Sequence, residues 1–586
     1  MPANPESHDR KNETSTSSRD GTGTRHLLML GLVVSLLWLQ RFNGPIDLRF
    51  DGGVYYVLGT SLAEGRGYRL LNEPGDIEAI QYPPLLPLIV AGTELMVGDS
   101  DPLRVGKYLR LLYLLIAAGH AAASYALCRR FLSARFALLA ALMCTIHVHT
   151  FFHSNLLFAE LPFAFVTTAC LWLHFRLKGW RRFVAETPLL WAGFLLRTAG
   201  VALLLSWIAE AVLLRQWKAA ALRLVVAALP VVLWQMFVSE VRSSEGYLKP
   251  AYSFQRAPYQ YYNVSYAENM LLKDPFTPES GKATIRDLLD RVPDNITVFP
   301  KSLSEGITAA PGYWELTPDW PRNWRRFVQI PREIGKVLMK SFLVLIMLGS
   351  VILLQRRSFL VPVYFFATLS MLSLTPWPQQ FARYLSTVTP LLCLCFCTSI
   401  ATLLTLLSKL PLWPLRAAAQ GAALLLGLTP LWIEAYSASE IYRTHLSTAY
   451  HYDKDGEEIH SELFYHSKEW RAFDRAVEWL KTEARPEAMV ATSSPHLVHL
   501  KTGLRAIFPP FEPDPSKADD LLRSVPVDYV IVDALDFVDV SRRYAAPAVL
   551  LHLGPSGSSP MPSPLWREVY AEPELKTWIY KSVREW

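Results

Sequence analysis

The sequence predicts a polytopic α-helical membrane protein of about 10–12 transmembrane helices with a small α/β domain at its C-terminal end. Of its 586 residues, 51% are hydrophobic and only 19% are charged, whereas a soluble protein of this length carries more charge. The apolar residues fall in blocks of about 15–25, long enough to cross a bilayer core. The region 437–586 has instead the mixed pattern of a small soluble domain.

The N-terminal segment 1–25 is polar and rich in Ser and Thr, so we expect a disordered cytoplasmic tail. The first apolar block, Leu27–Phe42, lacks a small-residue cleavage site. We therefore expect it to remain as a membrane anchor rather than to be removed as a signal peptide. The apolar stretch Leu85–Val97 is shorter and follows two prolines, which predicts a re-entrant or partial helix.

The remaining apolar blocks complete a transmembrane domain that we assign to residues 26–436. The block Leu189–Leu214 holds Arg197 and Gly200 at its centre, which indicates two short helices with a break between them. The other predicted spans are Tyr108–Cys128, Phe136–Phe152, Leu156–Phe175, Ala219–Val238, Val337–Leu354, Phe359–Leu374, Tyr384–Leu407 and Leu415–Ile433.

The short loops between these blocks carry the Lys and Arg residues, which by the positive-inside rule lie in the cytoplasm. All of them can share one side only if Leu189–Leu214 enters the membrane and returns, which agrees with the predicted break. The N-terminus is then cytoplasmic. The loops 43–104 and 242–335 and the domain 437–586 face outward, as expected of a multi-pass protein of a bacterial inner membrane.

Cysteine usage and charge exclude several classes of partner. All six cysteines fall in or at the ends of predicted spans, so no external disulfide framework is expected. The formal net charge of +6 matches the bias of the cytoplasmic loops and implies no nucleic-acid partner.

The outward regions are expected to contain their own structure. The loop 242–335 is long and rich in Tyr, Trp and Pro, which predicts short interfacial helices such as Ala283–Asp290 and Trp324–Lys336. The C-terminal domain shows helical and strand periodicities. Its predicted elements are a helix at Ser467–Ala484, strands at Met489–Ser494 and Val527–Asp533, and a final hairpin at Arg567–Val583.

Three ionisable residues from distant parts of the chain are expected at the outward surface: Asp51, Glu160 and Arg383. A carboxylate can act as general base toward an acceptor hydroxyl or amine, and an arginine can hold a phosphate bidentately. Together they indicate group transfer from a phosphate-linked donor. Simpler roles remain open: a solvated loop acid for Asp51, a helix cap for Glu160, and a snorkelling side chain for Arg383.

The order of several short motifs resembles the GT-C superfamily of integral-membrane glycosyltransferases, in the branch of protein O-mannosyltransferases and aminoarabinose-lipid A transferases. The resemblance extends from Leu27 to Val583. The motifs are D-x-x-x-Y at Asp51–Tyr55, L-A-E-G-R-G-Y at Leu62–Tyr68, Y-P-P at Tyr82–Pro84, A-E-L-P at Ala159–Pro162, L-x-R-x-x-G at Leu195–Gly200 and A-R-Y-L at Ala382–Leu385.

The resemblance implies roles for individual residues. Asp51 and Glu160 take the places of catalytic acids in the first two outward loops. Arg383 would hold the donor phosphate, with support from Arg197. The substrate pocket would be lined by Tyr55, Tyr82 and Tyr384. Protein mannosyltransferases often carry two adjacent acids in the first loop, and the glycine after Asp51 weighs against that subgroup.

The function expected from the resemblance is a glycosyltransferase that moves a sugar from a polyprenyl-phosphate donor to a lipid, glycan or protein acceptor at the outer membrane face. The alternatives are a polytopic transporter or flippase, and a non-catalytic scaffold of envelope polysaccharide assembly. No cofactor is expected, although the i, i+4 spacing of His149 and His153 leaves a divalent metal as an alternative. The sequence does not identify the sugar or the acceptor.

Overall fold

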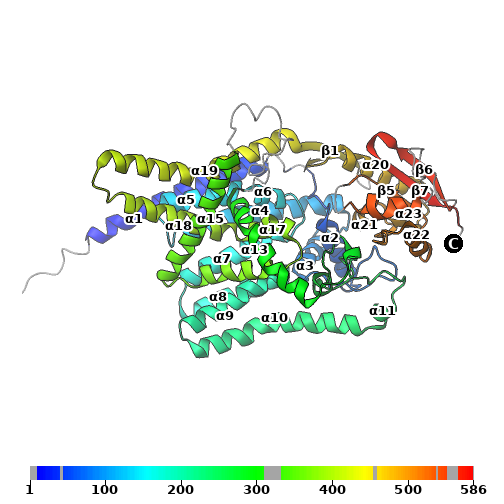
Figure 1. Cartoon of the computed structure of the whole chain (residues 1–586), viewed down its shortest axis with the longest axis horizontal. Coiled ribbons are helices and arrows are strands. Elements are labelled where there is room, and N and C mark those ends of the chain that lie inside the picture. Colours follow the sequence, from blue (N-terminus) through cyan, green and yellow to red (C-terminus); the bar gives the residue numbers. More distant parts are fainter. Residues whose placement is uncertain are drawn as a thin grey trace, which may run out of the picture.

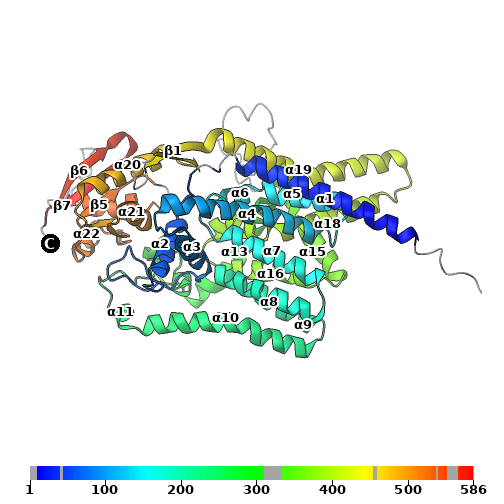
Figure 2. The ribbon, with the colours of Figure 1, turned by 180° about the vertical axis from the view of Figure 1, so that it is seen from behind.

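The structure is a computed structural model that describes residues 10–39, 42, 44–308, 332–452, 458–535, 539–550 and 565–584. A bundle of helices forms one part of the molecule and a small sheet domain the other (Figure 1). Figure 2 shows from behind that the long helix α19 (Trp413–His445) connects them, and that the sheet domain follows it directly. The C-terminal domain thus begins after His445, somewhat later than the predicted boundary at residue 437.

The helices of the bundle follow most of the predicted spans. Among the described residues, four helices are long and apolar enough to cross a membrane by length and composition: Pro102–Cys128, Trp217–Ser243, Gly335–Gln355 and Pro378–Leu407. The expected total of 10–12 spans stays a prediction. The bundle helices are α1 (Arg10–Trp38), α4 (Pro102–Cys128), α5 (Ala134–Ile146), α6 (Val148–His153), α7 (Glu160–Arg176), α8 (Gly179–Leu196), α9 (Val201–Leu213), α10 (Trp217–Ser243), α15 (Arg332–Gln355), α16 (Leu360–Ser373), α17 (Phe381–Leu385), α18 (Thr389–Leu407) and α19.

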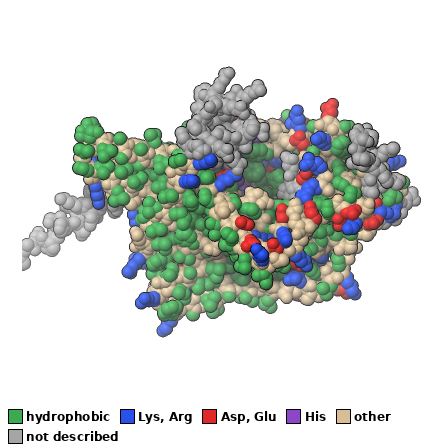
Figure 3. Space-filling model, in the orientation of Figure 1, with side chains coloured by type: hydrophobic (Ala, Val, Ile, Leu, Met, Phe, Trp, Pro, Cys, Tyr) green, Lys and Arg blue, Asp and Glu red, His purple; other side chains and the backbone are tan. Residues whose placement is uncertain are grey.

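Apolar side chains cover the surface of the bundle. In the space-filling view they form a broad hydrophobic face over the bundle, whereas Asp and Glu gather toward the C-terminal domain (Figure 3). Lys and Arg, without Asp or Glu in this view, mark the opposite end of the bundle. An exposed apolar surface of this extent fits a lipid environment. All six cysteines are free and buried, as expected from their places in the spans.

Two helical predictions need correction. Helix α1 begins at Arg10, inside the segment predicted to be disordered, although this segment contains Gly21 and Gly23. The predicted span Phe136–Phe152 is two helices, since His147 between α5 and α6 adopts a non-helical conformation (φ −50°, ψ 123°). The predicted span Tyr384–Leu407 lies within the continuous helix Pro378–Leu407, in which the short 3₁₀ turn η6 (Ser386–Val388) stands between α17 and α18.

The outward loops fold over one end of the bundle. The first carries α2 (Asp51–Ala63) and α3 (Leu85–Val97), and α3 has the bounds predicted for a short helix. The second carries α11 (Glu245–Leu248), α12 (Tyr266–Met270) and α13 (Ile285–Thr308). Helix α13 is much longer than the predicted Ala283–Asp290, because it continues through Pro293 and Pro300 and buries its second half against the bundle. Of the predicted helix Trp324–Lys336, residues 324–331 lie outside the described residues.

The C-terminal domain is an α/β domain, as predicted. Its main sheet has the order β4-β3-β5-β7-β6, with β3, β4 and β5 parallel and the predicted final hairpin, β6 and β7, antiparallel. A separate hairpin, β1 and β2, precedes it. The elements are β1 (Leu446–Tyr452), β2 (Glu458–Phe464), α20 (Lys468–Glu483), β3 (Met489–Ala491), α21 (Pro495–Thr502), β4 (Arg505–Ile507), α22 (Pro515–Arg523), β5 (Tyr529–Val532), α23 (Ala546–Val549), β6 (Trp566–Glu572) and β7 (Thr577–Ser582).

A buried ionic network holds four consecutive helices of the bundle together. His174 of α7 contacts Glu210 of α9 at 2.8 Å and Glu186 of α8 at 2.9 Å. Arg223 of α10 donates to the same Glu210 at 3.0 Å, and Trp207 of α9 donates to Glu186 at 2.8 Å. Each of the four charged or titratable residues is less than 5% exposed. The network therefore fixes the helices that flank the break at Arg197.

Removal of one member of this network should destabilise the bundle. For Arg223→Leu we expect a loss of about 3–5 kcal/mol, because the buried Glu210 carboxylate loses its arginine and keeps only the contact with His174. Thermal unfolding of the detergent-solubilised protein measures this as a lower Tm. Arg182→Gln is the matched control. Its guanidinium lies 3.9 Å from Glu186, too far for a hydrogen bond, and its side chain is 27% exposed, so its loss should cost little. Equal unfolding temperatures for the two variants would contradict a stabilising role of the network.

Candidate functional site

Asp51 is the first residue of α2, and the backbone immediately before it is strained. Phe50 has φ 58° and ψ −131°, a conformation that a bulky L-residue keeps only where its surroundings hold it. Gly53 lets the helix approach the C-terminal domain, since a Cβ there would lie 3.1 Å from Cβ of His496. Asp51 is thus held at the N-terminal end of a helix, where the helix dipole favours a carboxylate.

Arg197 lies in the break that the sequence predicted between α8 and α9. Its backbone is extended (φ −149°, ψ 134°), and the 3₁₀ turn η2 (Thr198–Gly200) follows it. A Cβ on Gly200 would lie 2.6 Å from the amide nitrogen of Phe194, so only glycine fits this close return of the chain. The break places the Arg197 guanidinium at a cavity instead of within a continuous helix.

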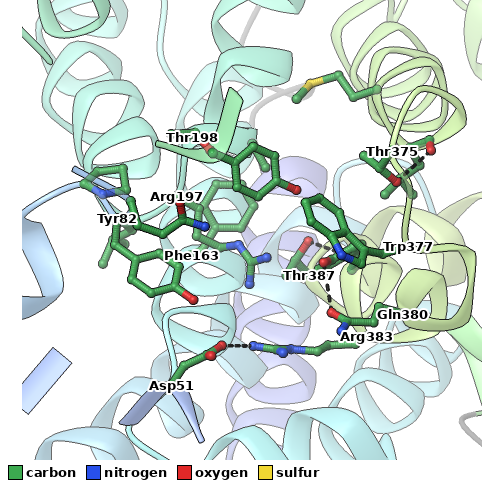
Figure 4. A pocket seen from close by; sticks show the side chains of 18 of the residues that line it. Asp51, Tyr82, Phe163, Arg197, Thr198, Thr375, Trp377, Gln380, Arg383 and Thr387 are labelled. Atoms are coloured by element: carbon green, nitrogen blue, oxygen red, sulfur yellow. Dashed lines mark hydrogen bonds and ion pairs between the residues drawn. The ribbon is translucent and has the colours of Figure 1, made fainter. Parts of the chain in front are cut away.

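Four charged side chains form a continuous chain of ion pairs beside this cavity. Arg383 of α17 bonds Oδ2 of Asp51 through Nη2 at 2.6 Å and Oε1 of Glu160 through Nε at 2.6 Å. Nη1 of Arg197 lies 2.6 Å from the same Oε1 atom. Figure 4 shows Asp51 facing Arg383, with Arg197 directed into the same space. Residues predicted to meet from three distant segments therefore do meet.

Glu160 has a different position from the other three. It is the first residue of α7, is 2% exposed, and is not among the residues that line the cavity. The side chains of Asp51, Arg197 and Arg383 are 14%, 18% and 26% exposed and do line it. Glu160 therefore bonds both guanidinium groups on the side that faces away from the cavity. This geometry suits a positioning role better than direct contact with a substrate.

The predicted tyrosines surround the carboxylate of Asp51. The rings of Tyr55 and Tyr82 are 4.9 Å apart, and Tyr82 is followed at 6.0 Å by Tyr262. Tyr262 donates a hydrogen bond from its hydroxyl to Oδ1 of Asp51 at 3.1 Å. Burial, and then the Asp51 carboxylate, raise the pKa of Tyr82 and of Tyr262 above the usual value. Both phenols therefore stay protonated and available as donors.

The cavity has a volume of about 260 Å³ and lies between the bundle and the two outward loops. Its lining combines a charged end at Asp51, Arg197 and Arg383 with aromatic rings and an apolar wall from α9 and α16. The aromatic lining residues include Tyr55, Tyr82, Phe163, Tyr261, Tyr262, Tyr266, Phe276, Tyr364, Trp377 and Tyr384. Such a cavity can take an anionic group at one end and apolar chain at the other.

Several of these lining residues were not predicted as site residues. Tyr262 is the most direct, because it bonds Asp51, yet 211 positions separate the two in sequence. Trp377 donates from Nε1 to the hydroxyl of Tyr261 at 3.2 Å, and the predicted Tyr384 donates to Gln380 at 2.9 Å. The sequence signal for these residues is the high aromatic content of the loop 242–335. It indicates that the loop is functional, but it does not distinguish one aromatic residue from another.

The histidines near the site form a stack of rings. His147 and His153 are buried and His149 is half-buried, with successive ring centroids 5.7 Å apart. His147 contacts the backbone carbonyl of Glu305 through Nε2 at 3.2 Å. Within the part of the chain that the structure describes, no group of three or more His, Cys, Asp or Glu residues is arranged to hold a metal ion.

Comparison with known proteins identifies the fold. No protein-family model and no curated protein matches the sequence. The apo crystal structure of ArnT from Cupriavidus metallidurans aligns with 95% of this chain and 98% of its own, with TM-score 0.50 and 12% identity. The chain has the GT-C fold.

A second GT-C structure agrees. The apo Archaeoglobus fulgidus oligosaccharyltransferase aligns with 87% of this chain and 69% of its own, with TM-score 0.50 and 15% identity. A crystal structure of the same ArnT bound to undecaprenyl phosphate aligns less closely, over 94% of this chain and 97% of its own, with TM-score 0.46 and 12% identity.

Glu160→Gln should weaken the structure around the cavity. The substitution keeps the shape of the side chain but leaves two partly buried guanidinium groups without their shared carboxylate, which we expect to cost about 3–5 kcal/mol. The double variant Glu160→Gln with Arg197→Gln should recover part of this loss, because one uncompensated charge is removed. Thermal unfolding of both variants tests the interaction. A double variant no more stable than Glu160→Gln would count against the shared pairing.

Proposed function

We propose that the protein is a glycosyltransferase that moves a sugar from a polyprenyl-phosphate donor to a lipid, glycan or protein acceptor. The observation that carries this proposal is the meeting of Asp51 with Arg383 at the mouth of an aromatic and apolar cavity. The GT-C fold supports it, since ArnT and the archaeal oligosaccharyltransferase share that fold. ArnT also binds undecaprenyl phosphate, a ligand with one anionic end and a long apolar chain.

The proposed reaction is a direct displacement at the anomeric carbon of the donor sugar. The acceptor oxygen or nitrogen forms a bond to this carbon while the bond from the carbon to the phosphate oxygen breaks. The acceptor proton passes to the carboxylate of Asp51, acting as general base. Arg383 and Arg197 bind the phosphate and stabilise the charge that grows on it as polyprenyl phosphate leaves. Tyr55 and Tyr82 line the space for the sugar.

The charges of the site link donor binding to the activation of Asp51. In the ligand-free structure two guanidinium groups balance two carboxylates. A donor phosphodiester adds a further negative charge and competes with Asp51 for Nη2 of Arg383. Once the phosphate has taken this position, the Asp51 carboxylate is released from Arg383 and can turn toward the acceptor. The base is therefore free to take the acceptor proton only after the donor has bound.

The proposed location is the inner membrane of a bacterium, with the site at the outer face. The N-terminus is placed in the cytoplasm and the C-terminal domain in the periplasm, in a protein of about 10–12 spans. The distribution of charge supports this orientation, because Lys and Arg mark the end of the bundle that lies away from the C-terminal domain (Figure 3). Positively charged loops favour the cytoplasmic side.

The function is tested by comparing a deletion strain with an Asp51→Asn strain of the native organism. Mass spectrometry of lipid-linked sugars and envelope glycans should find the same result in both: an unused polyprenyl-phosphate sugar accumulates and one glycan decoration is lost. The membrane level of the Asp51→Asn protein serves as the control for folding and insertion. Normal glycans and no accumulated donor in either strain would contradict the proposal. A normal Asp51→Asn strain beside a defective deletion strain would instead indicate a scaffold.

Asp51→Asn should also strengthen the binding of undecaprenyl phosphate while it abolishes transfer. The variant removes the carboxylate that competes for Arg383, and we expect Kd to fall about tenfold, which corresponds to about 1.4 kcal/mol. Titration of the purified protein in detergent at low salt measures the change, with undecaprenol as the phosphate-free control. Tyr262→Phe is the matched variant, because it retains the competing charge. Binding that stays equal or weakens in Asp51→Asn would contradict the competition.

A further inference from the structure

We propose that the C-terminal domain positions the catalytic carboxylate, through Phe50 on one side of Asp51 and Tyr262 on the other. The domain is then part of the active site and not a separable module for acceptor binding. The kinetic test of this proposal rests on the proposed function, because it measures sugar transfer. The way in which the C-terminal domain holds Asp51 can be tested without any reaction. In both ribbon views, α2 lies where the bundle meets the C-terminal domain (Figures 1 and 2).

The first connection is a buried arginine two residues before Asp51. Arg49 donates to the backbone carbonyls of Phe464 at 2.6 Å and Tyr465 at 3.1 Å, both at the end of β2. It also pairs with Asp47 at 2.7 Å, and its guanidinium lies 5.2 Å from the ring of Trp470 in α20. Arg49 is only 4% exposed. The backbone that enters α2 is thus bound directly to the C-terminal domain.

The second connection explains how Phe50 keeps its strained backbone. Its ring contacts Trp470 edge-to-face at 5.6 Å and Phe158 at 6.5 Å. Phe158 in turn lies under the guanidinium of Arg383, 4.6 Å from ring centroid to Cζ. A bulky residue at positive φ persists only where packing over-determines it. Trp470 supplies this packing from the C-terminal domain, and the orientation of Asp51 depends on it.

The third connection reaches the carboxylate itself. The ring of Tyr262 packs edge-to-face against His496 of α21 at 4.9 Å and stacks on Phe508, after β4, at 5.9 Å. Its hydroxyl bonds Oδ1 of Asp51, while Oδ2 bonds Arg383. One oxygen of the carboxylate is therefore fixed by a phenol that the C-terminal domain supports, and the other by the bundle.

The apolar core confirms that these contacts are not isolated. One buried cluster contains Tyr55 and Tyr56 of α2 together with Trp470, Leu497 and Ile531 of the C-terminal domain. No solvent layer separates α2 from the domain at these residues. Displacement of the domain would consequently move the first turn of α2, and a shift of about 1 Å at a reacting group can lower a rate about 100-fold.

Trp470 and Trp479 provide a matched pair for the test, because both lie on α20. Trp470 contacts Phe50, whereas Trp479 contacts Tyr529 and Tyr570 within the C-terminal domain. In the full-length protein, Trp470→Leu should lower kcat about 10- to 100-fold with an unchanged KM for the donor, since Trp470 does not line the cavity. Trp479→Leu should leave kcat within about twofold, and Trp470→Phe should restore most of the activity.

Hydrogen exchange measures the same effect without any transfer reaction. Amides of the first turn of α2 should exchange faster in Trp470→Leu than in the wild type, and at the wild-type rate in Trp479→Leu. Equal exchange and equal kcat in the two leucine variants would overturn the inference. If the wild type transfers no sugar, the proposed function fails, and the exchange of α2 still decides whether the C-terminal domain positions Asp51.

Discussion

The guanidinium of Arg383 bonds two carboxylates that come from opposite parts of the chain, and the arrangement of the cavity depends on this interaction. Its Nη2 reaches Asp51 at the start of α2, and its Nε reaches Glu160 at the start of α7. Charges this poorly exposed are stable in a membrane protein only when they are paired. The helix ends that carry them therefore lie together at the end of the bundle that meets the C-terminal domain.

This arrangement is also one that a ligand can change. The pairing between Arg383 and Glu160 is deeply buried, whereas Asp51 and Arg383 meet at the cavity surface. A phosphate can displace the exposed carboxylate more readily than the buried one, because the buried one is shared with Arg197 and cannot be solvated as it leaves. Glu160 thus keeps both arginines in place while Asp51 exchanges its partner. In the proposed reaction, burial and the second pairing with Arg197 distinguish the structural acid, Glu160, from the reactive one, Asp51.

The sequence predicts the charged residues and the helix break of this site better than its aromatic contacts and its helix lengths. Arg197 and Gly200 within an apolar block indicated a broken helix, and the structure contains that break because only glycine fits at position 200. The charged residues could be placed on one side of the membrane from the loop charges. Helix α13 is much longer than the predicted Ala283–Asp290, since its second half is buried against the bundle and continues through two prolines. Tyr262 could not be predicted as a partner of Asp51, because that contact depends on how the C-terminal domain packs on the loop.

The most direct measurement of this account is an experimental structure of the full-length protein with undecaprenyl phosphate bound. We predict phosphate oxygens within hydrogen-bond distance of Arg383 and Arg197. We also predict that Oδ2 of Asp51 has left Nη2 of Arg383, while Glu160 still bonds both arginines. A phosphate bound elsewhere, with the pair between Asp51 and Arg383 intact at 2.6 Å, would contradict the account.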